Sequence, residues 1–306
     1  MSRNEKVYRV ITDKVIELLE RGVVPWRKPW VNGPATRSYK GREYRGINLL
    51  TLSAEAGLRG LQGCWITFRQ VQQAGGRVKK GARGVPVVFW KWIDREDDDG
   101  ESAGRSFPVC RYYRVFSLCQ TEGVPEPAWL SKRLSPRDRF DSVMAAEAIV
   151  SGYRNGPDIR HGGDRAAYFH DSDLVTMPGR RQFTSAEGYY WTLFHELAHS
   201  TGHESRLGRF TSCAHVPFGS ASYSREELVA EMGAAFLAAE AGLGSREGLE
   251  NAAAYIGSWI RVLRNEPRMV VVAAAQAQKA ADHILGRSYG DSETPAEDAP
   301  AAARPA

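Results

Sequence analysis

The stretch Tyr189–His203, YYWTLFHELAHSTGH, decides the organisation of the C-terminal half of this chain. It contains a His-Glu-x-x-His pattern formed by His195, Glu196 and His199. Residues four apart on a helix project from the same face, so the two imidazoles can bind one metal ion. Zn²⁺ suits such a pair, and Glu196 then lies where it can act on a water bound to the ion. The stretch therefore predicts a helix that carries one zinc ion and a catalytic glutamate.

A second helix, at about residues 224–241, is predicted to supply the third ligand. Glu227 and Glu231 lie one turn apart on it, and Glu227 follows His199 by 28 residues. Glu227 is favoured as the ligand and Glu231 as the acid that orients an imidazole. Glu227 has an alternative use as a helix cap, because it stands three residues after Ser224. His203 is the competing candidate for the third ligand. If Glu227 binds the metal, His203 is expected to lie next to the ligands instead.

The His-Glu-x-x-His pattern is typical of zinc metallopeptidases. Peptide hydrolysis also requires a group that stabilises the oxyanion of the transition state. Tyr223, just before the second helix, is predicted to do this, with Tyr189 and His203 as alternatives. The predicted strand at Leu174–Met177 is expected to pair with an extended peptide, as an edge strand can.

Hydrophobic periodicity and capping patterns predict the other elements of the chain. Two capping boxes, at Thr67–Gln70 and Thr184–Glu187, mark the starts of helices. The predicted helices cover about residues 4–21, 49–56, 67–74, 137–150, 184–202, 224–241, 249–264 and 268–285. The predicted strands cover about 85–93, 107–118, 168–170 and 174–178.

Charge is distributed unevenly along the chain. Residues 1–125 hold 22 Lys and Arg against 13 Asp and Glu, a net charge of +9. Residues 126–306 hold 19 against 23, a net charge of −4. Six of the 13 acids crowd into Asp94–Glu101, which is expected to be a solvated loop tip between two strands. The basic half therefore suggests a polyanionic partner.

Aromatic and basic residues alternate in the segments 26–30, 39–48, 77–83 and 90–92 of the basic half. Bases stack on exposed aromatic rings and phosphates bind nearby cations, so single-stranded DNA is the favoured partner, with duplex DNA as an alternative. The predicted DNA-binding residues are Trp26, Arg27, Lys28, Trp30, Tyr39, Arg42, Tyr44, Arg45, Asn48, Arg69, Arg77, Lys79, Lys80, Arg83, Trp90 and Lys91.

The sequence excludes a membrane protein and a disulfide scaffold. No run of eighteen apolar residues occurs, and the N-terminus has no signal-peptide core. The four cysteines show no framework spacing and are expected to be reduced thiols, which indicates a cytoplasmic protein. The expected fold class is α+β. Residues 1–125 form a basic DNA-binding domain, residues 126–290 a mainly helical metallopeptidase domain, and residues 291–306 a disordered tail.

The chain resembles the ArdC-type antirestriction proteins of plasmids and mobile elements, which are related to the N-terminal parts of some conjugative primases. The resemblance covers about residues 4–287. It rests on motifs in both halves: 24–30, 44–48, 65–70, 76–84, 87–91, 193–203, 223–237 and 254–259. It implies an N-terminal single-stranded-DNA-binding domain, a C-terminal zincin-like metallopeptidase domain of the gluzincin type, and protection of incoming DNA from restriction during conjugation.

Three hypotheses follow. The first is a zinc metallopeptidase that DNA binding localises, acting on a protein or peptide substrate. The second is a non-catalytic protein that coats DNA and has a structural zinc site. A metal-dependent nuclease is third, since the chain lacks the clustered aspartates that two metal ions require.

Overall fold

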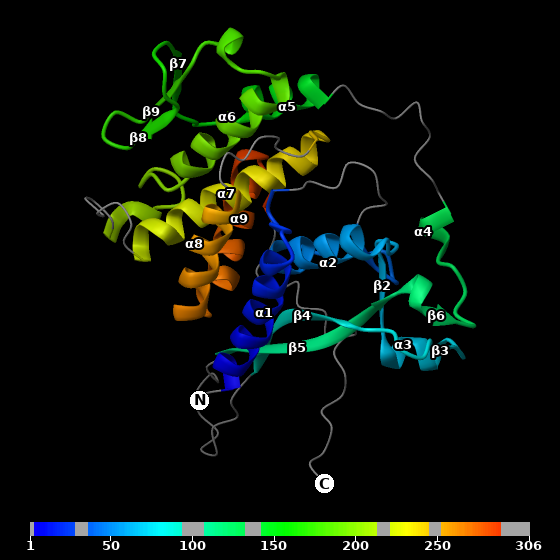
Figure 1. Cartoon of the computed structure of the whole chain (residues 1–306). Helices are drawn as coiled ribbons and strands as arrows, with labels where there is room; N and C mark the ends of the chain where they lie inside the picture. Colours follow the sequence, from blue (N-terminus) through cyan, green and yellow to red (C-terminus); the bar gives the residue numbers. More distant parts are fainter. Residues whose placement is uncertain are drawn as a thin grey trace, which may run out of the picture.

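The computed structural model describes residues 3–27, 36–93, 107–131, 142–212, 221–244 and 252–288. In Figure 1 the N-terminal sheet and its helices lie on one side of the molecule, and the mainly helical C-terminal half lies on the other side. This mixture of helices and sheets confirms the predicted α+β class. No helix of the described residues is long and apolar enough to cross a membrane.

The N-terminal half is built on a four-stranded sheet in the order β1-β2-β5-β4. Strands β4 (Val85–Ile93) and β5 (Phe107–Ser117) form the predicted antiparallel hairpin, and the acidic loop between them lies outside the described residues. Strand β2 (Cys64–Thr67) pairs with β5, and β1 (Arg37–Ser38) pairs with β2. A separate two-stranded sheet joins β3 (Arg77–Val78) to β6 (Thr121–Glu122).

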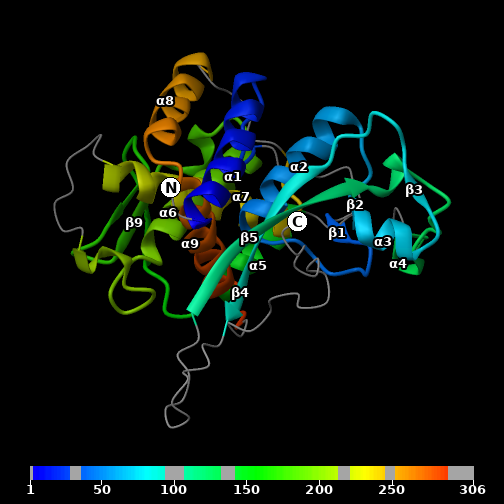
Figure 2. The same cartoon turned by 90° about the horizontal axis from the view of Figure 1, so that it is seen from below.

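Helices cover this sheet and connect it to the rest of the molecule. They are α1 (Arg3–Glu20), α2 (Gly46–Arg59), α3 (Phe68–Gln73) and the short α4 (Ala128–Ser131). The predicted capping box of Thr67 and Gln70 does begin α3. Helix α2 is longer than the predicted 49–56, and it ends at Gly60, which has a positive φ of 61°. In Figure 2, α1 stands between the sheet and α8.

The edge of the N-terminal sheet is protected by a side chain. Asn48 of α2 donates from Nδ2 to the carbonyl of Val88 at 2.6 Å and accepts from its N–H at 2.8 Å. The amide therefore imitates a neighbouring strand along edge strand β4. Asn48 was predicted to contact DNA, but this pairing commits its amide to the fold instead.

The C-terminal half combines a small sheet with a group of packed helices. Its sheet has the order β7-β9-β8, with β7 (Asp158–His161), β8 (Ala167–Phe169) and β9 (Leu174–Met177). The helices are α5 (Ser142–Gly152), α6 (Ala186–Ser200), α7 (Ala221–Ala241), α8 (Ala252–Asn265) and α9 (Met269–Ile284). Three 3-10 turns, Leu118–Gln120, Arg180–Gln182 and Arg209–Ser212, complete the described elements.

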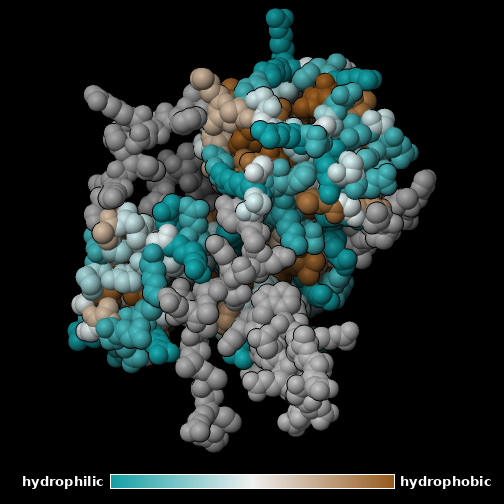
Figure 3. Space-filling model, turned by 180° about the vertical axis from the view of Figure 1, so that it is seen from behind, coloured by the Kyte–Doolittle hydropathy of each residue, from teal (hydrophilic) through white to brown (hydrophobic). Residues whose placement is uncertain are grey.

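One hydrophobic core runs through both halves. Ile11 and Leu19 of α1 belong to the same buried cluster as Phe194 of α6, Leu228 of α7 and Ala273 of α9. A smaller cluster around Leu52, Trp65 and Val115 fills the space between α2 and the sheet. The surface seen from behind is mostly hydrophilic, and its largest apolar areas lie over the C-terminal half (Figure 3).

Candidate metal centre and nucleic-acid surface

The helix with the His-Glu-x-x-His pattern is α6, and its first turn differs from the prediction by one residue. Ser185, not Thr184, is the N-cap, and its side chain accepts a hydrogen bond from the N–H of Gly188 at 3.0 Å. The face with Leu193 and Leu197 is buried in the large core. The histidines therefore lie on the opposite side of a helix whose rotation is fixed by packing.

Helix α7 crosses α6 at very close range. A Cβ atom at Gly233 would come within 2.9 Å of the Cβ of Ala198, so only glycine allows this approach. The helix begins at Ala221, earlier than the predicted Ser224. Glu227 consequently lies in the second turn, beyond the position of a capping residue, and faces the two histidines.

His195, His199 and Glu227 place their donor atoms together. The two Nε2 atoms of the histidines lie 3.1 Å apart. The carboxylate oxygens of Glu227 lie 3.6 Å from Nε2 of His195 and 3.5 Å from Nε2 of His199. Ligands about 2.1 Å from a tetrahedrally coordinated ion are about 3.4 Å apart, so these spacings fit a single Zn²⁺ or similar divalent ion.

The acid beside His199 is Glu226 and not the predicted Glu231. Oε1 of Glu226 lies 3.4 Å from Nδ1 of His199, the ring nitrogen that faces away from the ligand cluster. Arg209 holds this carboxylate with two hydrogen bonds, from Nη2 at 2.8 Å and from Nε at 3.2 Å. Glu231 is one turn further along α7 and accepts a hydrogen bond from Arg27 at 3.3 Å. The sequence prediction chose the wrong member of the Glu-Glu-Leu-Val-Ala-Glu segment.

Electrostatics at the site favour a cation. Burial acts to lower the pKa of His199, but the carboxylates of Glu226 and Glu227 outweigh it and raise that pKa. Burial acts to raise the pKa of Glu226, while His199 and Arg209 lower it below its usual value. Glu226 is therefore ionised and can accept the Nδ1–H of His199, which leaves Nε2 free to act as a ligand.

The other predicted site residues are placed differently. Nδ1 of His203 lies 2.7 Å from Oγ of Ser205, and its ring packs against His170 at 5.1 Å. Among the described residues, the group able to hold a metal contains Glu227 and not His203. Glu196 is buried on α6, and the side chain of Tyr223 lies outside the described residues.

Strand β9 is not the edge strand that was predicted. It pairs with β7 in parallel and with β8 antiparallel, so both of its edges are occupied. The free edge of this sheet on the antiparallel side belongs to β8, which packs against α6. Phe169 at the end of β8 is 50% exposed.

The described part of the first predicted DNA-binding segment, Trp26 and Arg27, packs within the protein. Trp26 is fully buried, donates from Nε1 to the hydroxyl of Tyr255 at 3.1 Å and packs edge-on against Trp259. The guanidinium of Arg27 stacks 3.9 Å above the Tyr255 ring, beside its contact with Glu231. The prediction that Trp26 and Arg27 contact DNA is replaced by a structural role, because both bind partners in the C-terminal half. Lys28 and Trp30 lie outside the described residues.

Three further members of the predicted set also contact other parts of the protein. Arg45 forms an ion pair with Asp282 of α9. Burial nevertheless raises the pKa of Asp282 above its usual value. The hydroxyl of Tyr39 donates to the carbonyl of Pro125 at 2.9 Å. Tyr44 packs on the smaller core cluster.

The remaining predicted residues form the exposed part of the set. Arg77 pairs with Glu122 at 2.7 Å, and Lys79 donates to the carbonyl of Cys119 at 2.9 Å. Trp90 is 36% exposed, and the side chain of Lys91 lies outside the described residues. Among the described members of this predicted set, four basic side chains form no ion pair or hydrogen bond with another described residue: Arg42, Arg69, Lys80 and Arg83.

Two exposed aromatic residues were missed by the sequence analysis. Phe68 is 52% exposed at the start of α3, next to Arg69, and Tyr112 is 43% exposed on β5. Tyr112 pairs with Val88 across the hairpin, two register positions from the pair of Trp90 and Cys110. Arg209 was missed as well, since an arginine in a loop gives no sequence signal of the acid that it holds.

The buried position of Trp26 makes a prediction that separates packing from DNA binding. Trp26→Phe removes the hydrogen bond to Tyr255 and part of the buried volume, so the free energy of unfolding should fall by about 1–3 kcal/mol. The matched change Trp90→Phe, at an exposed ring, should cost less than about 0.5 kcal/mol. Urea denaturation measures both. Equal costs would contradict the assignment of Trp26 to the core.

Known proteins show the same arrangement in the same order. Residues 5–116 match the N-terminal domain of the anti-restriction factor ArdC, and residues 144–276 match a zincin-like metallopeptidase family. A DNA primase TraC of Escherichia coli is 36% identical over 308 residues. The match covers 93% of this chain but only 20% of the primase, so the chain spans about a fifth of that relative.

Solved structures extend the likeness to the fold. The crystal structure of the antirestriction ArdC protein from the R388 plasmid in its metal-free form has a TM-score of 0.70 and 35% identity, covering 92% of this chain and 99% of that one. The Mn(II)-bound structure of the same protein has a TM-score of 0.70 and 37% identity, with coverages of 91% and 97%. With this identity along nearly the whole of a solved ArdC chain, the protein belongs to the ArdC family of antirestriction proteins and carries that family's zincin-like domain.

Proposed function

We propose that this protein protects incoming mobile-element DNA by binding single strands through its N-terminal half and by a zinc-dependent peptidase site in its C-terminal half. The observation that carries the proposal is the convergence of His195, His199 and Glu227 from two helices, beside Glu196. Membership of the antirestriction family supports the link to DNA transfer.

His195, His199 and Glu227 would hold one divalent ion. Two imidazoles and a carboxylate at tetrahedral spacing favour Zn²⁺, although the Mn(II)-bound relative makes Mn²⁺ the competitor to test. When bound, such an ion lowers the pKa of a water molecule and polarises the carbonyl of a peptide. Glu226 and Arg209 would fix the orientation of His199.

The chain's own groups would carry the proton transfers. Glu196 follows His195 on α6, and its carboxylate is near enough to His199 to contribute to the raised pKa of that imidazole. It would accept the proton of the attacking water and deliver it to the leaving amine. An extended peptide would add to the free edge of β8, which runs beside α6, with Phe169 available for a side chain of the substrate.

The N-terminal half offers the surface for DNA. Arg42, Arg69, Lys80 and Arg83 have no acidic partner among the described residues, and exposed aromatic rings are available to stack on bases. Unpaired bases stack on aromatic rings regardless of sequence, so this surface favours single strands over duplex DNA.

The variant Glu196→Gln tests whether the peptidase chemistry matters. It preserves the size of the side chain but removes the base, so metal and DNA binding should persist while hydrolysis of a peptide library falls by at least about 100-fold. Protection of transferred DNA should fall in parallel in a conjugation assay against a restricting host. If protection survives in this variant, the protein acts by coating DNA and its metal site is structural.

A further inference from the structure

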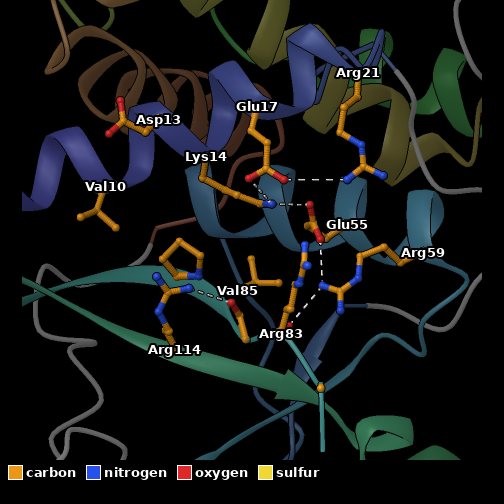
Figure 4. Close-up of a pocket in the computed structure, with 13 residues that line it drawn as sticks. Val10, Asp13, Lys14, Glu17, Arg21, Glu55, Arg59, Arg83, Val85 and Arg114 are labelled. Atoms are coloured by element: carbon orange, nitrogen blue, oxygen red, sulfur yellow. Dashed lines mark hydrogen bonds and ion pairs between the residues drawn. The ribbon is translucent and has the colours of Figure 1, made fainter.

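A cavity of about 670 Å³ opens between α1, α2 and the start of the hairpin (Figure 4). Its walls come from one face of α1, from the end of α2, from the loop that precedes β4 and from β5. None of its lining residues belongs to α6 or α7, which carry the proposed metal ligands. The cavity is therefore separate from the metal centre.

Its floor is a buried ion triad. Glu55 is only 1% exposed and binds Nζ of Lys14 at 2.6 Å and Nη1 of Arg59 at 3.0 Å. Burial acts to raise the pKa of Glu55, but the two cations outweigh it and lower that pKa, so the carboxylate is ionised. Lys14 also pairs with Glu17 at 2.9 Å, and Glu17 lies 3.8 Å from Arg21. These three cations and two anions leave one net positive charge.

The rim adds cations that the protein does not neutralise. Arg114 of β5 donates from Nη1 to the carbonyl of Gly84 at 2.9 Å and, among the described residues, has no acidic partner. The Arg83 side chain, which also lines the cavity, likewise has no acidic partner among the described residues. In total, five basic residues line the cavity against three acidic ones, so it attracts an anion.

The cavity also has an apolar part and is larger than a phosphate requires. Val10 lines it as a half-buried side chain, and Val85 and Pro86 line it as buried residues. Its volume falls within the roughly 300–1,000 Å³ of sites for small molecules. Guanidinium groups bind phosphate through several N–H donors and also stack on bases. A ligand with one phosphate, a sugar and a flat ring satisfies all of these features.

We propose that this cavity binds one unpaired nucleotide of a DNA strand, with its phosphate on Arg83 and Arg114 and its sugar and base against the half-buried Val10. The proposal rests on the proposed function and assigns its single-strand preference to a defined site. A base that is paired in a duplex cannot enter such a cavity, so the cavity selects single strands. A free nucleotide shares the same chemistry and is the alternative source of the ligand.

The test is fluorescence anisotropy with a labelled oligothymidylate of about 15 nucleotides. The double variant Arg83→Gln/Arg114→Gln should weaken binding about tenfold or more. The slope of log Kd against log salt should become shallower by about 0.7, because the two arginines share one phosphate and each phosphate contact on a single strand contributes about 0.7. The control Arg154→Gln/Arg165→Gln makes the same change of charge at exposed positions in the C-terminal half and should leave both quantities unchanged.

A second variant separates filling of the cavity from loss of charge. Val10→Trp adds volume without changing charge and should weaken oligothymidylate binding several-fold while the thermal unfolding midpoint stays near that of the wild type. Unchanged affinity in both variants, with a wild type that binds, would overturn the cavity proposal and leave DNA binding intact. A wild type without affinity for single strands would overturn the proposed function itself.

The source of the nucleotide is tested with dTMP alone. If dTMP binds the wild type and not the double variant, while oligothymidylate binding is equal in both, the cavity takes a free nucleotide and the proposal for DNA is wrong. Competition between dTMP and oligothymidylate for the wild type, lost in the double variant, supports it.

Discussion

Replacing Glu227 by alanine is expected to abolish tight binding of the divalent ion. The variant removes one of three donors that lie 3.1–3.6 Å from one another, and two imidazoles alone hold the ion weakly. Affinity should fall by more than the roughly 10–100-fold that loss of an outer partner costs. Competition with a chromogenic chelator measures this for Zn²⁺ and Mn²⁺, which also decides between the two ions.

Two further variants act as controls for this prediction. Glu226→Gln keeps a hydrogen-bond acceptor near Nδ1 of His199 but removes its charge, so affinity should fall by about 10–100-fold. His203→Ala should leave affinity unchanged, since Nδ1 of His203 contacts Ser205. Retention of the metal by Glu227→Ala together with its loss from His203→Ala would reverse the assignment.

Arg206→Ala is expected to cause a large loss of stability. The Arg206 side chain is almost wholly buried and forms a two-pronged ion pair with Asp173. It also donates to the carbonyls of Ser200 at 2.8 Å and Asn155 at 3.0 Å, which ties the chain beyond α6 to the turn between β8 and β9. The variant removes these hydrogen bonds and a further one to the hydroxyl of Tyr168 at 3.2 Å, and it leaves the Asp173 carboxylate without its cation. The free energy of unfolding should therefore fall by about 3–5 kcal/mol.

The matched control and the pH dependence sharpen this test. Arg160→Ala breaks an exposed ion pair with Asp158 and should cost less than about 1 kcal/mol. Hydrogen bonds from Arg206 lower the pKa of Asp173, so its contribution is complete above the pKa of an unfolded aspartate and is lost as pH falls through the folded pKa. Denaturant titrations from neutral to acidic pH should show this loss in the wild type and less of it in Arg206→Ala.

Local signals in the sequence were sufficient for the long helices and for the hairpin. The spacing of His195 and His199, the turn between them and the capping signals each depend on residues within a few positions of one another. The short strands β1, β2, β3, β6 and β7 were not predicted. Each has only two to four residues, too few to show an alternating pattern, and their pairing depends on distant segments.

The errors in the predicted DNA-binding set have a common physical cause. Alternating tryptophan and arginine looks the same in sequence whether the rings stack on bases or on the protein. Trp26 is buried beside Tyr255, which lies 229 positions further along the chain. Arg45 pairs with Asp282, which lies 237 positions away. Only the three-dimensional fold brings such partners together. The prediction from local composition therefore overestimated the number of residues available to contact DNA.

Helical spacing also could not decide which acid binds the metal and which orients His199, among Glu226, Glu227 and Glu231. Helical periodicity places Glu227 and Glu231 on one face, but it does not give the rotation of α7 relative to α6. The contact between Gly233 and Ala198 sets that rotation, and it directs Glu226 toward Nδ1 of His199.

The packing of α1 has a consequence for how the chain is made. This helix contacts α8 and α9, and Thr12 donates to the carbonyl of Pro267, 255 positions later. Translation proceeds at about 5–20 residues per second, so α8 and α9 are synthesised on the order of 10–50 seconds after α1. During that time the part of its apolar face that packs on α8 and α9 is uncovered, although α2, β4 and β5 are already available to the rest. Binding of chaperones to nascent chains should therefore be strongest before α9 leaves the ribosome.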